Sequence, residues 1–70
     1  IYDEYNDYDY QRKIIDFKYS LSFFDMQVFE LRYNSFSYGE IADLLDVNKK
    51  KVDNTLLKIR KKMEKYFLFS

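Results

Sequence analysis

Apolar residues recur along this chain at the spacing of an α-helix, and no segment shows the alternation of a strand bounded by turn residues. In residues 11–21, Ile14, Phe17 and Leu21 are separated by three and four positions, which predicts a short amphipathic helix. The 70 residues contain no Pro and a single Gly, so little interrupts helical structure. The expected fold is therefore all-α, a small domain of three to four helices.

The next segment predicts a helix with two apolar stripes. Ser22 and Asp25 have capping-box spacing, so we expect this helix to begin at about Phe23. The stripes consist of Phe24, Val28 and Leu31 and, on nearly the opposite side, of Met26, Phe29 and Tyr33. The second stripe is either covered by the preceding helix or free to dock another protein.

A second capping box, Ser37 with Glu40, predicts a short helix over 38–45. A three-residue turn follows, in which Val47 can fill the corner and Asn48 is a favoured N-cap. The last predicted helix runs from about Lys49 to Phe67, with Val52, Leu56, Ile59 and Met63 facing the core. Two helices joined in this way predict a C-terminal helix-turn-helix.

The outer face of the last helix carries groups that can read DNA. Asn can bond an adenine edge, Lys suits guanine or phosphate, and Leu can contact a thymine methyl. In a helix-turn-helix, the first part of the second helix reaches the base edges. The residues on this face are Lys50, Asn54, Leu57, Lys58 and Lys61.

The formal net charge is zero, but the charges are unevenly placed. Residues 1–10 hold four acids and no base, while residues 48–65 hold eight bases against two acids, a net of +6. Lys49, Lys50 and Lys51 stand where the helix dipole disfavours each by about 0.3–1 kcal/mol. Neutralisation of DNA phosphates would outweigh that penalty, although a basic stripe can also be a solvated face. Residues 1–10, acidic and rich in Tyr, are expected to be a solvated connector rather than a functional acidic arm.

The composition excludes several classes of function. The chain has no Cys and no His, which removes disulfides, thiolate nucleophiles and the usual zinc sites. No nucleophile–base arrangement is visible, so we expect no enzyme activity, no cofactor and no metal. No apolar run is long enough to span a membrane, and the start is not a secretory signal, so a cytoplasmic protein is expected. The first residue is not Met, and we expect a piece of a longer polypeptide.

These motifs resemble region 4 of the bacterial sigma-70 family. The resemblance spans about Leu21 to Tyr66 and is carried by VFELRYNSFSYGEIADLLDVNKKKVDNTLLKIRKKMEKY. The elements SY-EIA and VDNTLLKIRKKMEKY are more specifically similar to alternative sigma factors of the stationary-phase, sporulation and competence type. LuxR-type regulators share part of the pattern, but they would have T-V-x-x-H where this chain has residues 51–54, KVDN.

The resemblance implies a domain, residues 11–70, that recognises the promoter −35 element and docks on the β flap of RNA polymerase, in the cytoplasm and at the nucleoid. An anti-sigma factor is a further implied partner. Two rival functions are a stand-alone or LuxR-type helix-turn-helix regulator and a pure protein-interaction module. Asp53 replaces a basic residue common in primary sigma factors, and Asp46 stands where such motifs often have Gly.

The resemblance also assigns site residues by position. The base-reading candidates are Lys49, Lys50, Asp53 and Asn54, with Leu57 added from the outer-face argument. The candidates for contact with the DNA backbone are Ser37, Tyr38, Lys51, Lys58 and Lys61. The polymerase-docking candidates are Phe23, Met26, Phe29 and Tyr33.

Overall fold

The computed structural model describes the backbone of residues 2–69 and the side chains of residues 9–68. Over that range the chain is all helix and turn, with no strand. The helices are α1 (Tyr2–Tyr19), α2 (Phe23–Tyr33), α3 (Tyr38–Leu45) and α4 (Lys49–Phe69). The predicted all-α fold with a C-terminal helix-turn-helix is confirmed, and the predicted bounds of α3 are met at both ends.

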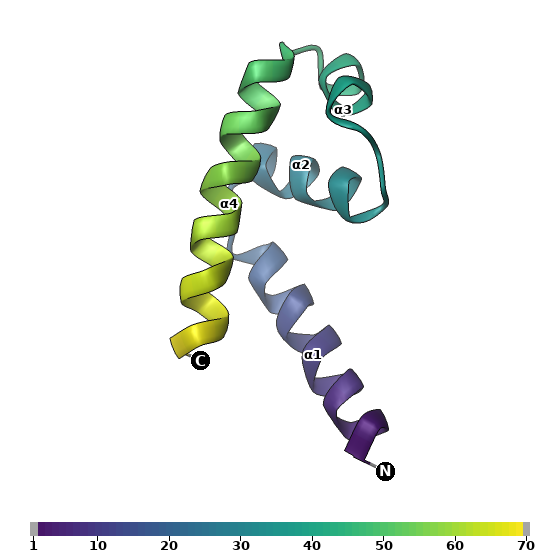
Figure 1. The fold of residues 1–70 in the computed structure, drawn as a ribbon, viewed down its shortest axis with the longest axis vertical. Coiled ribbons are helices and arrows are strands. Elements are labelled where there is room, and N and C mark those ends of the chain that lie inside the picture. Colours follow the sequence, from purple (N-terminus) through teal and green to yellow (C-terminus); the bar gives the residue numbers. More distant parts are fainter. Residues whose placement is uncertain (1, 70) are drawn as a thin grey trace.

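Helix α4 forms the long axis of the domain, and the other helices are arranged around it (Figure 1). It packs against α2 and α3, while α2 also packs against α1 and α3. Helix α3 lies beside the start of α4, and both ends of the chain lie at the opposite end of the molecule (Figure 1). The start of α4 is therefore remote from both termini.

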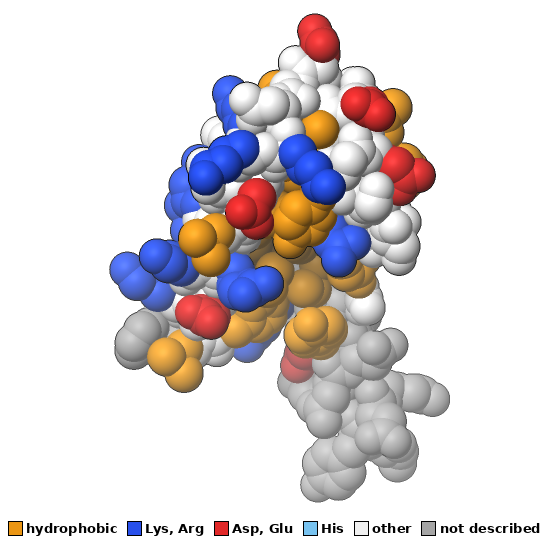
Figure 2. All heavy atoms as spheres, turned by 45° about the horizontal axis from the view of Figure 1, so that its top comes forward, with side chains coloured by type: hydrophobic (Ala, Val, Ile, Leu, Met, Phe, Trp, Pro, Cys, Tyr) orange, Lys and Arg blue, Asp and Glu red, His pale blue; other side chains and the backbone are white. Residues whose placement is uncertain are grey.

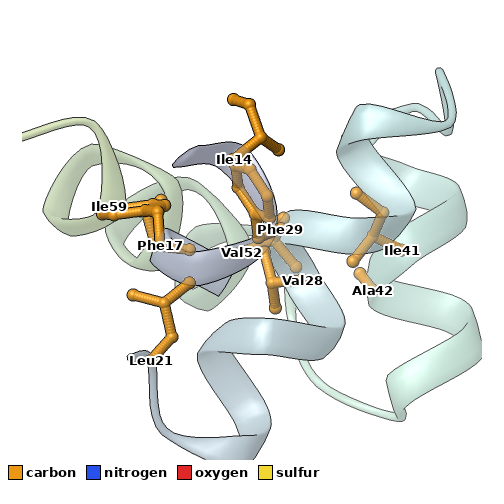
Figure 3. Close-up of a cluster of buried hydrophobic side chains, with 9 residues drawn as sticks. All are labelled: Ile14, Phe17, Leu21, Val28, Phe29, Ile41, Ala42, Val52 and Ile59. Carbon is orange, nitrogen blue, oxygen red and sulfur yellow. The ribbon is translucent and has the colours of Figure 1, made fainter. Parts of the chain in front are cut away.

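The core is formed by all four helices and by the turn after α1 (Figure 3). Ile14, Phe17 and Leu21 are buried as the sequence spacing predicts, although Leu21 lies just beyond the end of α1. The core-facing stripe of α4 is also confirmed, because Val52 and Ile59 are buried and the rest of the stripe is partly buried. The buried hydrophobic residues are Ile14, Phe17, Leu21, Val28, Phe29, Ile41, Ala42, Val52 and Ile59.

Aromatic rings join α1 to α2 and α4. The ring centroid of Phe17 lies 5.7 Å from that of Phe29 and 5.4 Å from that of Tyr66. Since Phe29 is only 7% exposed beneath this contact, the covering of the second α2 stripe by the preceding helix is confirmed at that position. Tyr33, which stacks on Phe29 at 6.0 Å, remains exposed.

Helix α1 is longer than the sequence analysis predicts. It begins at Tyr2, so residues 2–10, which are expected from the sequence to form a solvated connector outside the predicted helix, are helical. No Pro or Gly interrupts the segment, and its last residue packs on the domain, with the Tyr10 ring centroid 5.8 Å from that of Phe67. A role for residues 1–10 in connecting domains stays a prediction, and Ile1 and the side chains of residues 1–8 lie outside the described part of the chain.

The first turn of α2 corrects another expectation. Helix α2 begins at Phe23 as predicted, and the Ser22 hydroxyl accepts a hydrogen bond from the Asp25 N–H at 3.4 Å. The Asp25 carboxylate, however, does not return to the backbone of Ser22. It points into the interface with α4 and lies 2.9 Å from the ammonium group of Lys58. Only half of the predicted capping box is therefore present.

The turn between α3 and α4 changes direction at Asp46. Its backbone is left-handed, with φ 57° and ψ 49°. The Val47 N–H then donates to the Ala42 carbonyl at 3.0 Å, which satisfies a free carbonyl at the end of α3. Apart from Gly, Asp is one of the few residues that adopt this left-handed backbone conformation. Val47 is partly buried against the core, as predicted.

We expect Asp46→Gly to stabilise the domain by up to about 1 kcal/mol, because Gly adopts the left-handed conformation without steric cost. Urea unfolding followed by circular dichroism measures the change. Asp43→Gly is the matched control, since Asp43 is exposed and helical. This change should instead destabilise the domain by a few tenths of a kcal/mol, roughly the difference in helix propensity between Asp and Gly. Equal destabilisation by both changes would contradict the role given to the Asp46 backbone.

Candidate nucleic-acid interface

The start of α3 is fixed by the predicted capping box. The Ser37 N–H donates to Glu40 Oε1 at 2.8 Å, and the Glu40 N–H donates to Ser37 Oγ at 3.2 Å. Two free N–H groups at this helix end are thereby satisfied. Ser37 is exposed and Tyr38 is half-buried, so both DNA-backbone candidates of this turn lie at the surface.

This capping box makes a prediction for acid pH. The Ser37 backbone N–H, and then its hydroxyl, hold the pKa of Glu40 below its ordinary value of 4.5. The stability given by this contact is thus fully present above pH 4.5 and is lost as the pH falls through the lower pKa of the folded domain. An NMR titration of the Glu40 carboxyl carbon should show the lowered pKa.

Ser37→Ala should return the pKa of Glu40 partly toward its ordinary value, because the backbone N–H remains a donor. The same change removes the N-cap and should cost about 1 kcal/mol of unfolding free energy. Glu40→Gln serves as the control, since it keeps the shape and removes the titration. A Glu40 pKa that is unaltered in the folded wild type would contradict the contact.

The start of α4 is fixed by Asn48, whose side-chain oxygen accepts from the Lys51 N–H at 2.8 Å. The predicted N-cap is confirmed. One face of the first turns of α4 is open to solvent, and every base-reading candidate is exposed. These residues are Lys49, Lys50, Asp53, Asn54 and Leu57.

Basic side chains gather over α4 (Figure 2). Lys50 and Asn54 lie one helical turn apart and share a shallow polar hollow at the start of this helix. The hollow is lined by Asn48, Lys50, Lys51, Asn54, Thr55 and Lys58. A concave surface with an amide side chain, flanked by ammonium groups, has the chemistry to bond a base edge while neutralising phosphates.

Two of the lysines predicted to contact phosphates already have partners within the domain. The Lys51 ammonium lies 4.9 Å from the centre of the Phe24 ring, and that of Lys58 lies 2.9 Å from Asp25 Oδ2. Lys61 is exposed and has no ion pair among the described side chains. The sequence does not predict these two contacts, because each joins residues that are distant along the chain. Asp25, moreover, has the spacing of a capping residue.

The structure does not bring the four polymerase-docking candidates onto one surface. Phe29 is a core residue, because α1 covers it, and Met26 is half-buried. Phe23 is 71% exposed at the start of α2, whereas Tyr33 is 56% exposed at its end.

Tyr33 borders an aromatic groove of about 290 Å³ between α2, α3 and α4. Apolar side chains line most of it, and two arginines stand among them. The groove residues are Phe29, Arg32, Tyr33, Tyr38, Leu56, Ile59, Arg60 and Met63. Arg32 is itself ordered by the Phe36 carbonyl, to which it donates at 3.0 Å.

A capped short helix, a tight turn and a basic second helix define this chain as a helix-turn-helix domain. Residues 25–63, more than half of the chain, match the family Sigma-70, region 4. The chain belongs to this family, which consists of DNA-binding domains of transcription factors and not of enzymes. Membership implies recognition of the promoter −35 element and association with RNA polymerase.

Searches of curated proteins and of solved structures gave no significant match. In the part of the chain that the structure describes, no helix has the length and apolar character needed to cross a membrane. Over the same residues, no three or more acidic, His or Cys side chains are grouped to hold a metal ion.

Proposed function

We propose that this chain is the region 4 domain of an alternative sigma factor of the stationary-phase, sporulation or competence type. In this proposal it selects promoters by their −35 element while it docks on the β flap of RNA polymerase. The observation that carries the proposal is the exposed first part of α4, where Lys50 and Asn54 project together from a helix-turn-helix of this family. The VDNTLLKIRKKMEKY run supports the alternative type.

The DNA-binding part of the proposal places the start of α4 in the major groove. Asn54 bonds a base edge, and Lys49, Lys50, Asp53 and Leu57 contact neighbouring bases. Lys61 contacts a phosphate farther along α4, while Ser37 and Tyr38 contact the backbone from the start of α3. Because the DNA is chromosomal, the protein would act at the nucleoid.

The polymerase-binding part of the proposal places the β flap in the aromatic groove. Helical spacing puts Leu56 and Met63, which line the groove, on the side of α4 opposite Lys50 and Asn54. DNA and polymerase can therefore be bound at the same time. An anti-sigma factor that occupied the groove would compete with the flap without touching the DNA-reading residues.

Capture of the purified domain by the isolated β flap tests this proposal. Tyr33→Asp should abolish capture, because it puts a carboxylate at the border of the groove, at a residue that is 56% exposed. Phe23→Asp is the matched control, since it changes an exposed aromatic residue of the same helix that lies outside the groove. Phe29 is unsuitable for this purpose because its burial makes loss of folding the expected result.

Capture that is lost with Tyr33→Asp and kept with Phe23→Asp would support docking in the groove. A folded wild-type domain that is not captured, but still binds DNA, would indicate a stand-alone helix-turn-helix regulator. A domain that is captured but binds no duplex at low salt would indicate a pure interaction module, because phosphate contacts strengthen as salt is lowered.

A further inference from the structure

Asp25 is an unusual residue in this fold because it is a carboxylate within the core. It is 3% exposed, and Asp25 and Thr55 are the buried polar residues of the described chain. A buried charge needs a partner, and Lys58 of α4 supplies it at 2.9 Å. The Lys58 side chain is 55% exposed, so it bridges the core and the basic surface of α4.

A second contact lies beside this ion pair. Phe24, the neighbour of Asp25, receives the Lys51 ammonium over its ring at 4.9 Å. Lys51 and Lys58 are seven residues apart, which is about two turns of α4 and places them on the same side of the helix. Phe24 and Asp25, which we call the α2 clamp, therefore hold α4 at two levels.

The clamp restricts rotation of α4 about its own axis. Asn54 lies between Lys51 and Lys58 along the helix and shares the polar hollow with both. A rotation that changed the direction of Asn54 would separate Lys58 from the Asp25 carboxylate and leave a charge buried without a partner.

We propose that Asp25 is a positioning residue, which holds Lys58 as an internal counter-ion and so removes this lysine from the set that neutralises DNA phosphates. The inference rests on the proposed DNA-binding function and revises the role that sequence position suggests for Lys58. Because the Asp25–Lys58 pair carries no net charge, approach of a phosphate to Lys58 releases few counterions. Lys61, three residues farther along α4, has no such partner in the described structure.

The salt dependence of DNA affinity tests the inference. Wild type, Lys58→Gln, Lys61→Gln and Asp25→Asn are titrated with one duplex at several salt concentrations. Lys61→Gln should reduce the slope of log K against log salt by about one, whereas Lys58→Gln should leave the slope nearly unchanged. Asp25→Asn should increase the slope by about one, because it releases Lys58 to the DNA.

Asp25→Asn should also reduce the ratio of specific to non-specific affinity, because it weakens one of the two clamp contacts that fix the direction of Asn54. A variant that merely lost stability would contain a smaller fraction of folded, active protein. Its specific and non-specific affinities would then fall together, and their ratio would be unchanged. A decrease of the slope by Lys58→Gln that equals the decrease by Lys61→Gln would overturn the inference.

Unfolding without DNA separates failure of the inference from failure of the proposed function. Lys58→Gln should lower the folding constant by about tenfold or more, because it leaves the Asp25 charge buried alone. Adding Asp25→Asn to that variant should recover part of the loss. If the effects of Lys58→Gln and Asp25→Asn on the free energy of unfolding are simply additive, the inference about the Asp25–Lys58 pair is overturned. If the two effects are coupled but the domain binds no duplex, the proposed function is overturned instead. If Lys58→Gln does not fold, the salt slope of the double variant is compared with that of Asp25→Asn. The slope of Asp25→Asn should be larger by about one, because only that variant keeps the released Lys58, and equal slopes would overturn the inference.

Discussion

Replacing Phe17 by Ala is expected to remove a large part of the stability of the domain at 25 °C. Phe17 is 1% exposed and touches the rings of Phe29, Tyr66 and Phe67, so its loss leaves a cavity where three helices meet. Such a change costs about 3–5 kcal/mol, whereas a domain of this size has a total stability of roughly 3–10 kcal/mol. Circular dichroism during urea unfolding measures the loss.

Ile15→Ala is the matched control for this experiment. Ile15 lies on the same helix, two residues earlier, and is 47% exposed. We expect its replacement to cost less than about 1 kcal/mol, because little buried surface is lost. A Phe17→Ala variant with nearly wild-type stability would show that the aromatic contacts do not hold α1 to the rest of the domain.

The second large effect concerns DNA recognition. Asn54→Ala should weaken binding to the preferred duplex by about 1–3 kcal/mol, since it removes a side chain that can bond a base edge with two hydrogen bonds. Discrimination should be relaxed at one base pair and kept at the others. Affinities for the tightest duplex from a random pool, and for its single-base variants, measure both effects.

Lys61→Ala provides the comparison for Asn54→Ala. It should weaken all duplexes to a similar degree, because a phosphate contact carries no sequence information. If Asn54→Ala also weakened all duplexes equally, the base-reading role of Asn54 would be refuted.

The helix-turn-helix could be predicted from sequence because its signals are local. Ser37 and Glu40 stand three residues apart and specify the start of α3 by hydrogen bonds within one turn. Asn48 does the same for α4. The left-handed backbone of Asp46 was not evident from the residue itself, because Asp also occurs in many other conformations.

The remaining features depend on contacts between segments that are distant in sequence. Tyr10 meets Phe67, and Asp25 meets Lys58, only when the helices are packed. No periodicity within residues 1–10 or 22–33 specifies these partners. For Phe29, the helical spacing leaves open whether its stripe is covered or free, and Phe29 is a core residue because α1 lies across it.

The position of the chain ends has a practical consequence. Both described ends lie at the end of the molecule opposite the start of α4 (Figure 1). Because α4 contains 21 residues, its C-terminal end lies about 30 Å from its first turn along the helix. A fluorescent reporter or a surface tether attached to either terminus would thus leave the DNA-reading end facing solvent, and sensors immobilised in either orientation should report the same affinity.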